Sequence, residues 1–114
     1  MSKMIKYEEV RLKINVQIKD IVYLENYERK VIIHMAGGRK EEFYGSLKDV
    51  YDEQLKKFDF LFIHASYAVN YNYVSALKFN QVTLINDTIP LPISKNRKNE
   101  VRERYFEIVK KRRA

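Results

Sequence analysis

The side chains that could do chemistry are few, and two of them stand close together in the middle of the chain. His64 and Ser66 follow the apolar run 60–63, and the next apolar run stops at Asn70. A short apolar run bounded by polar residues is typical of a buried strand. His64, Ala65 and Ser66 are therefore predicted at a turn that a rigid strand holds at the rim of the fold, where it could react or contact a partner.

Neither catalysis nor metal binding is indicated by this pair. The other histidine, His34, lies in a β-branched segment and is predicted to be a structural strand residue. A metal site needs three or four convergent ligands, and the chain has no cysteine and no cluster of His and carboxylates at ligand spacing. Hydrolysis by Ser66 and His64 would also need an acid and an oxyanion hole, and no glycine-rich phosphate loop occurs. The sequence predicts a protein that is not an enzyme, without metal or cofactor.

Length and composition predict one folded domain over residues 1–114. The hydrophobic fraction of 46%, with nine Tyr and six Phe, excludes a wholly disordered chain. No run approaches the roughly 18 apolar residues of a membrane span, and the first residues lack the apolar stretch of a signal peptide. Together with the lack of cysteine, these features favour a cytoplasmic protein.

Positive charge is concentrated at the C-terminal end. The net charge is +7, and the segment 95–114 holds nine Lys and Arg against three Glu, so +6 of it lies there. Such asymmetry favours a polyanionic partner, either nucleic acid or an anionic membrane. A basic tail that only keeps the protein soluble has the same composition.

The elements that would hold the turn at Ser66 are mostly strands. Before it, period-two alternation and short β-branched runs predict strands at 10–18, 21–24, 31–35 and 41–44. The polar segment 26–30 is predicted to be the exposed tip of a hairpin, and the glycines of 36–39 predict a turn. Ser46 is predicted to cap a helix with an apolar face of Leu47, Val50, Tyr51 and Leu55.

After the central stretch, two strands and an edge strand precede a final helix. The strands are predicted at 74–79, 82–85 and 88–93, and the two prolines of the third suit an edge. Ser94 is predicted to cap a helix over about 96–111, whose apolar stripe is Val101, Tyr105, Ile108 and Val109. The predicted fold class is a mainly β domain with antiparallel sheets, peripheral helices and a C-terminal helix.

Four stretches, in the right order over about residues 10–100, resemble the pattern of the LytTR family, the DNA-binding output domain of many bacterial response regulators. The family's D-I-x-Y-x-E strand matches 20–25, and a second stretch matches 43–48. Its F-x-x-x-H-x-S-x-x-V-N is similar to the residues Phe60, His64, Ser66, Val69 and Asn70, and its P-V-S-R is similar to 92–95. The resemblance implies elongated antiparallel β-sheets of the LytTR type, with loops inserted into successive major grooves of promoter DNA.

The resemblance also implies which residues contact DNA. Carried over by position, the base contacts are Arg29 at the hairpin tip, Ala65 after the central strand and Lys95 after the late Ser. Two of these depart from the family pattern, since Arg or Asn is usual at the position of Ala65 and Arg at that of Lys95. The implied contacts to the DNA backbone are Lys30, His64, Ser66, Asn96 and Arg97.

The function predicted in this way is sequence-specific binding of double-stranded DNA at promoters, to regulate transcription in a two-component system. The sites are expected to be paired direct repeats, bound by a homodimer that forms on DNA. A receiver domain has no room in these 114 residues and would be a partner if the chain is an excised output domain. The alternative is a protein- or membrane-interaction module that acts through the basic C-terminal helix. RNA binding is less favoured, because most aromatic residues fall at predicted core positions.

Overall fold

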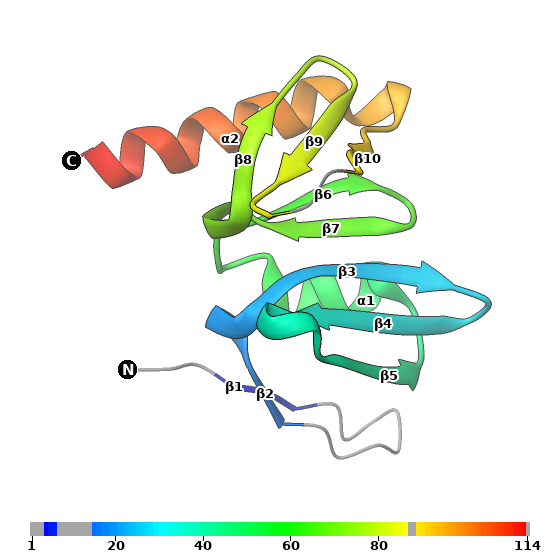
Figure 1. Ribbon diagram of the computed structural model, residues 1–114. Coiled ribbons are helices and arrows are strands. Elements are labelled where there is room, and N and C mark those ends of the chain that lie inside the picture. The colour runs from blue at the N-terminus through cyan, green and yellow to red at the C-terminus, as the bar shows by residue number, and fades with distance from the viewer. Residues whose placement is uncertain (1–3, 7–14, 87–88, 114) are drawn as a thin grey trace.

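The computed structural model describes residues 4–6, 15–86 and 89–113, and it consists of three antiparallel sheets and a long C-terminal helix (Figure 1). The strands are β1 (Met4–Lys6), β2 (Asn15–Gln17), β3 (Ile21–Tyr27), β4 (Lys30–Met35), β5 (Lys40–Tyr44), β6 (Phe60–His64), β7 (Tyr67–Asn70), β8 (Val74–Leu77), β9 (Gln81–Leu84) and β10 (Leu91–Pro92). The helices are α1 (Leu47–Val50), the π-helical η4 (Tyr51–Leu55) and α2 (Lys98–Arg113), with short 3-10 turns η2 (Ile18–Asp20), η3 (Ala36–Gly38), η5 (Tyr71–Tyr73) and η6 (Lys95–Arg97).

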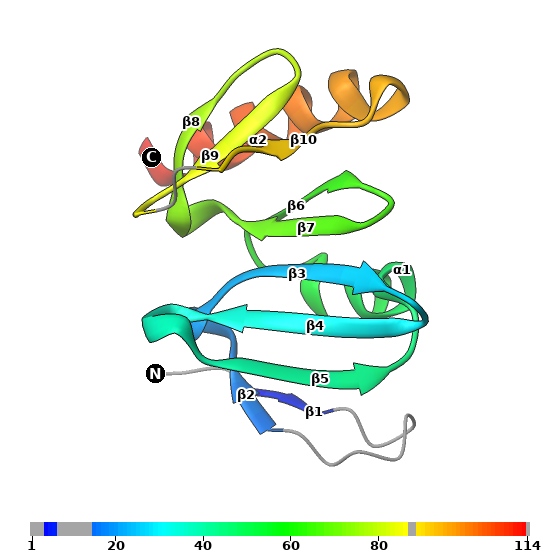
Figure 2. The ribbon, with the colours of Figure 1, turned by 45° about the vertical axis from the view of Figure 1, so that its right-hand side comes forward.

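The sheets are stacked along the long direction of Figures 1 and 2. The central five-stranded sheet has the order β5-β4-β3-β7-β6, the three-stranded sheet has the order β10-β9-β8, and β1 pairs with β2. In the described part of the chain the strand pairs are antiparallel, from Met4↔Gln17 in the β1–β2 pair to Leu77↔Val82 in the β8–β9 pair. The predicted fold class is therefore confirmed.

Two hydrophobic clusters hold these layers, and the hairpin β6–β7 contributes to both. The first cluster lies between the five-stranded sheet and the helical segment α1–η4, and includes Leu47, Leu55 and Phe60. The second lies under α2 and includes Leu61, Ile63, Val69, Val101 and Ile108. Alternate side chains of β6 point to opposite faces, so one strand fills two cores. Each fully buried Leu or Phe stabilises the fold by about 1.5–3 kcal/mol.

Most of the predicted elements occur, and their periodicity explains why. In β4, Val31, Ile33 and Met35 are buried while the residues between them are half-buried, which is the expected period of two. Ser46 caps α1 by accepting a hydrogen bond from the Asp49 backbone N–H at 3.4 Å, as predicted. The edge strand containing Pro92 is confirmed but spans only Leu91–Pro92. Of the predicted strand over 10–18, the part before residue 15 lies outside the described residues.

Two local predictions were wrong. The hairpin tip is not a loop of about five residues: Tyr27 pairs with Lys30, leaving a turn of Glu28 and Arg29 alone. The side chain of Ser94 does not cap the final helix; the backbone carbonyl of Ser94 accepts from the Arg97 N–H at 3.0 Å instead. Its hydroxyl is buried without a partner among the described residues, because the chain enters η6 with this side chain turned into the protein.

Candidate nucleic-acid interface

The first element of the site is the β3–β4 hairpin tip, whose two-residue turn is conformationally unusual. Glu28 and Arg29 have φ of 49° and 68°, and neither is a glycine. Positive φ at both central positions defines the type I′ turn, which matches the twist of a hairpin but normally uses Asn and Gly. Holding a long side chain in this region costs on the order of 1–3 kcal/mol per residue. Both side chains are exposed, and neither has a hydrogen-bond or ion-pair partner among the described residues.

Three hydrogen bonds hold the chain around this turn. The side-chain amide of Asn26 donates to the carbonyl of Lys30 at 2.8 Å, and its oxygen accepts from the Leu47 N–H at 3.1 Å. The Gly45 N–H donates to the carbonyl of Arg29 at 2.9 Å. The tip is thereby bound to the end of β5 and to the first turn of α1, so the surrounding backbone fixes the strained conformation.

The second element is the turn between β6 and β7, where His64 acts as a backbone acceptor. Its Nδ1 accepts a hydrogen bond from the Ser66 N–H at 3.0 Å, which requires this nitrogen to be unprotonated. The carbonyl of Ser66 accepts from the Asn26 N–H at 2.9 Å, tying the turn to the first tip. Ala65, between the two, is exposed. The ring of His64 therefore orients the turn, and Ala65 points its methyl group to solvent.

The third element is the start of α2. The Ser94 N–H donates to the carbonyl of Ile63 at 2.9 Å, so this segment lies against the end of β6. Lys95 and Asn96 follow in η6, and both are exposed. Neither side chain has a hydrogen-bond or ion-pair partner within the described part of the chain.

These three segments lie along one edge of the molecule. In Figures 1 and 2 the β3–β4 tip, the β6–β7 turn and the start of α2 follow one another up the right-hand side. Arg29, Ala65 and Ser66 border the same shallow hollow. The sequence assigned base contacts to three separate segments, and the fold brings all three to this edge, which we call the tip edge.

Two of the residues assigned to the DNA backbone already have partners. The Lys30 Nζ lies 3.2 Å from Glu42 and 5.4 Å from the centre of the Tyr44 ring. The hydrogen bond that Lys30 donates to Glu42, together with the negative charge of Glu42, raises the pKa of the exposed Lys30 above its usual value. The Arg97 guanidinium lies 4.2 Å from the Phe62 ring and 2.9 Å from Glu100.

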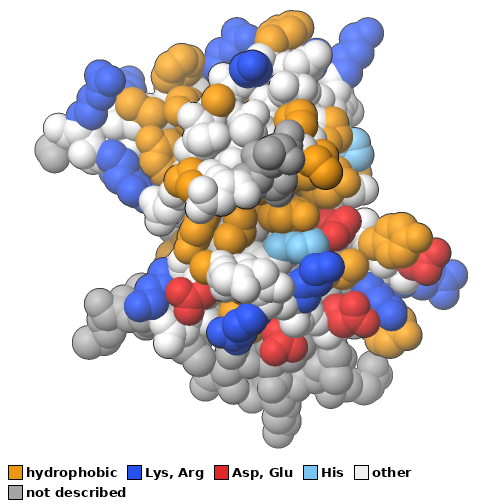
Figure 3. All heavy atoms as spheres, viewed as in Figure 1, with side chains coloured by type: hydrophobic (Ala, Val, Ile, Leu, Met, Phe, Trp, Pro, Cys, Tyr) orange, Lys and Arg blue, Asp and Glu red, His pale blue; other side chains and the backbone are white. Residues whose placement is uncertain are grey.

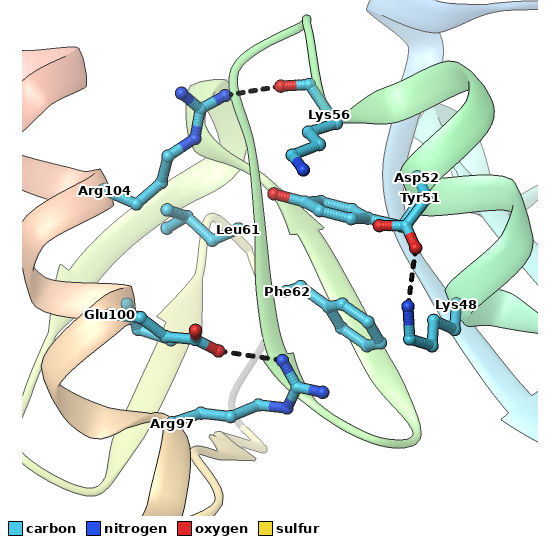
Figure 4. A pocket seen from close by; sticks show the side chains of 10 residues that line it. Lys48, Tyr51, Asp52, Lys56, Leu61, Phe62, Arg97, Glu100 and Arg104 are labelled. Atoms are coloured by element: carbon cyan, nitrogen blue, oxygen red, sulfur yellow. Dashed lines mark hydrogen bonds and ion pairs between the residues drawn. The ribbon is translucent and has the colours of Figure 1, made fainter.

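The Arg97 side chain lines a cleft between α1–η4 and α2 (Figure 4). Lys48 and Asp52 pair at 2.6 Å on the opposite wall, and that hydrogen bond holds the pKa of Asp52 below its usual value. The Arg104 guanidinium donates to the carbonyl of Lys56 at 2.9 Å across the cleft. Each of these two ion pairs lies within one wall of the cleft, and the hydrogen bond from Arg104 connects the two walls.

The basic C-terminal end of α2 lies on the side opposite the tip edge in both ribbon views (Figures 1 and 2). Lys111 and Arg112 bind the carboxylate of Asp59 at 2.6 and 2.8 Å. Partial burial by itself raises the pKa of Asp59, but the hydrogen bonds from Lys111 and Arg112 outweigh it and hold the pKa below its usual value. Part of the charge that dominates the sequence is therefore used to fasten the helix end to the loop before β6.

The face seen in Figure 3 mixes acidic and basic side chains below its waist and carries mostly basic and hydrophobic ones above. In β4, the Nε2 of His34 lies 2.6 Å from Glu25 Oε1, and the His34 ring stacks on the Tyr23 ring with 4.1 Å between their centres. The interpretation of His34 as a structural strand residue agrees with these contacts. Among the described residues no group of three or more His, Asp or Glu could hold a metal ion. No described helix is long and apolar enough to cross a membrane.

The family model of the LytTr DNA-binding domain matches residues 12–106 of this chain. The chain belongs to the LytTR family. It is thus a DNA-binding domain of a bacterial family that acts in two-component regulation of transcription. A similar solved structure is described as the LytTr DNA-binding domain of a methyl-accepting/DNA response regulator from Bacillus cereus. That structure is 20% identical with a TM-score of 0.67, covers 90% of this chain over 94% of its own length, and shares the fold. No curated protein matched the chain.

The sequence analysis missed two residues with a supporting role: Asn26, which connects the segments of the tip edge, and Asp59, which binds the end of α2. The sequence predicts Asn26 only as part of the exposed hairpin tip 26–30, yet both ends of its side chain and its backbone N–H connect tip elements. A lone Asn before a hairpin tip was the available signal. The role of Asp59 had no local signal, because its partners are more than fifty residues away along the chain.

Proposed function

We propose that this LytTR domain binds promoter DNA sequence-specifically by inserting the β3–β4 tip, the β6–β7 turn and the start of α2 into successive major grooves. The observation that supports this most directly is the single tip edge, where the three segments are joined by the backbone hydrogen bonds from Asn26 to Ser66 and from Ser94 to Ile63. A continuous, rigid row of exposed side chains suits a regular polymer better than a small ligand. Binding at promoters would regulate transcription.

Base reading is assigned to Arg29, Ala65 and Lys95. Arg29 is exposed at the strained tip, and an arginine can donate two hydrogen bonds to guanine O6 and N7. Ala65 offers only a methyl group, which can contact the methyl group of thymine. Lys95 contributes a point charge rather than a planar fork, so its discrimination between bases is weaker than an arginine's.

Contacts to the DNA backbone are assigned to Lys30, His64, Ser66, Asn96 and Arg97. Asn96 is free to bind phosphate, and the protonated Nε2 of a neutral His64 can donate to a phosphate oxygen. Lys30 and Arg97 must first exchange Glu42 and Glu100 for phosphate oxygens. These contacts position the domain and carry no sequence information.

Residues 1–114 are proposed to act as one LytTR domain in the cytoplasm, on paired direct-repeat sites and as a homodimer formed on DNA. A receiver domain is the proposed partner if the natural protein is longer. We propose that the domain has no catalytic activity of its own, since it belongs to a DNA-binding family.

Titration with duplex DNA at several salt concentrations tests this proposal. Neutralising Z phosphates gives a log–log slope of about −0.9Z, so affinity should fall steeply with salt. Selection from a random duplex pool should enrich a spaced direct repeat. A flat salt response together with no enrichment would contradict the proposal.

A second candidate, a protein or membrane docking module on α2, is favoured by two exposed phenylalanines beside basic residues. Phe79 and Phe106 are 66% and 55% exposed, and Lys98 lies 4.2 Å from the Phe79 ring. Truncation after residue 106 would not test it cleanly, because it removes Ile108 from the core. The double substitution Lys98→Gln and Arg102→Gln should abolish binding to anionic vesicles if this candidate is right, and should leave the DNA preference intact if the tip edge is the site.

A further inference from the structure

The turn residue Glu28 has no role in the assignments above, although it lies at the tip edge beside Arg29. Its side chain is exposed, and it is without a hydrogen-bond or ion-pair partner in the described part of the chain. The neighbouring Lys30, by contrast, is paired with Glu42. The most protruding point of the hairpin therefore presents one free carboxylate and one free guanidinium.

A carboxylate is an unexpected group at an edge that approaches a polyanion. Phosphate repels it, so it weakens binding to every sequence unless it contacts something other than the backbone. In the major groove, the groups that suit a carboxylate are the exocyclic amino groups, and cytosine N4 is the one usually bound by Glu or Asp. At this position Glu28 can contribute favourably only by accepting a hydrogen bond from a base.

The backbone of the turn supports a functional reason for this residue. Glu28 has φ of 49°, a conformation that glycine or asparagine adopts more easily. The bonds from Asn26 to Lys30 and from Gly45 to Arg29 hold the turn in place from outside. A strained residue that the surrounding structure holds rigidly is a candidate for function.

Across the shallow hollow from this turn lies Ala65, which cannot form a side-chain hydrogen bond. We infer that Glu28 is a specificity-determining residue that accepts a hydrogen bond from a cytosine amino group next to the guanine contacted by Arg29. The hairpin tip then reads two neighbouring positions with opposite hydrogen-bonding character, a donor and an acceptor. This inference rests on the proposed function, because it needs the tip to lie in a major groove.

The test is selection from a random duplex pool with the wild type, Glu28→Gln and Glu28→Gly. Wild type should enrich cytosine at one position. Glu28→Gln should shift that position toward adenine, which glutamine binds through N6 and N7, and the preference for cytosine over adenine should fall at least about fivefold. Glu28→Gly should lose preference there only, and it should fold at least as stably because glycine accepts the positive φ.

Glu41→Gln is the matched control, since Glu41 is an exposed carboxylate of β5 outside the tip. Both Gln variants remove one negative charge and should bind non-specific DNA somewhat more tightly. If Glu28→Gln and Glu28→Gly enrich the same bases as wild type, Glu28 acts through charge alone and the inference is overturned. If wild type itself enriches no sequence, the proposed function fails and the inference fails with it.

Discussion

The two ends of helix α2 both carry basic side chains, but their surroundings are opposite. Just before its start, in η6, Lys95 is exposed on the tip edge and forms no ion pair with any described residue. At its end, Lys111 and Arg112 are bound to Asp59 on the far side of the molecule. By count of charges, the far end is the better candidate for binding DNA. The segment at the start of the helix is nevertheless the better candidate, because it lies on the tip edge and its Lys95 is unpaired among the described residues.

This difference shows why charge density along a sequence does not locate a binding surface. A cation that is already paired must give up its carboxylate before it can bind phosphate, whereas an unpaired one loses only water. Substitutions at the two sides should therefore separate binding from stability.

The largest effect is expected for Arg29→Ala at the tip edge. Loss of a bidentate contact should reduce discrimination at one base pair by about 1–3 kcal/mol, measured by binding to a series of single-base operator variants. Arg39→Ala, an exposed arginine outside the tip edge, is the control. Equal discrimination by the Arg29 and Arg39 variants would remove Arg29 from the interface.

A second test concerns His64, which holds the β6–β7 turn. His64→Ala removes the acceptor of the Ser66 N–H and should lower the free energy of unfolding by about 1 kcal/mol. It should also weaken binding to all DNA sequences. His64→Asn should retain much of both, because an Asn side-chain oxygen can accept the same N–H. Unfolding in urea and duplex titration measure the two quantities, and identical losses in both variants would show that the acceptor is unimportant.

At the far end, Asp59→Asn should reduce stability and leave sequence preference unchanged. The loss should be about 0.2–1 kcal/mol at pH 7, since the cations are partly exposed. Because the folded pKa of Asp59 is lowered, its contribution is present above the unfolded pKa and is lost as pH falls through the folded one. The difference between wild type and variant, measured by thermal unfolding, should therefore shrink below about pH 4. A difference independent of pH would contradict the ion pair.

The smallest effect is expected for Lys110→Gln with Arg113→Gln, two exposed charges at the same end. At 0.1 M salt the field of a surface charge is screened over about 10 Å. These two residues lie at the end of α2 opposite the tip edge, so the salt dependence of DNA binding should barely change. Lys95→Gln should instead reduce the slope by up to about one unit, because it removes an unpaired positive charge from the tip edge itself. If the slope changed more in the double variant than in Lys95→Gln, the C-terminal end of α2 and not the tip edge would be the DNA-binding side.

Local patterns predicted most of the scaffold. Alternation in Val31, Ile33 and Met35 gave a strand, and Ser46 before an apolar helical face gave a capped helix, because both signals depend on neighbours in sequence. The turn at Glu28 was missed because its residues do not favour positive φ, and tertiary hydrogen bonds impose it. The partners of Asp59 come from distant sequence, so no local pattern could indicate them.

For the candidate site, too, some features could be predicted from the sequence and others could not. The assignments of Arg29, Ala65 and Lys95 came from a family resemblance, and they stay predictions, although the fold brings their segments to one edge. The ion pair of Lys30 could not be predicted, because Glu42 reaches it only through strand register. The contact of Arg97 with the Phe62 ring could not be predicted either, because it depends on packing.

The backbone bonds between the tips have a further consequence for the operator. Asn26 to Ser66 and Ser94 to Ile63 connect the tips through strands that are packed into two cores, not through loops that can lengthen. One extra base pair between two contacted steps moves the second by about 3.4 Å and turns it by roughly 35° around the duplex axis. The protein cannot follow that change without breaking core contacts. The helical phase between the steps within one half-site should therefore be fixed to a single base-pair spacing.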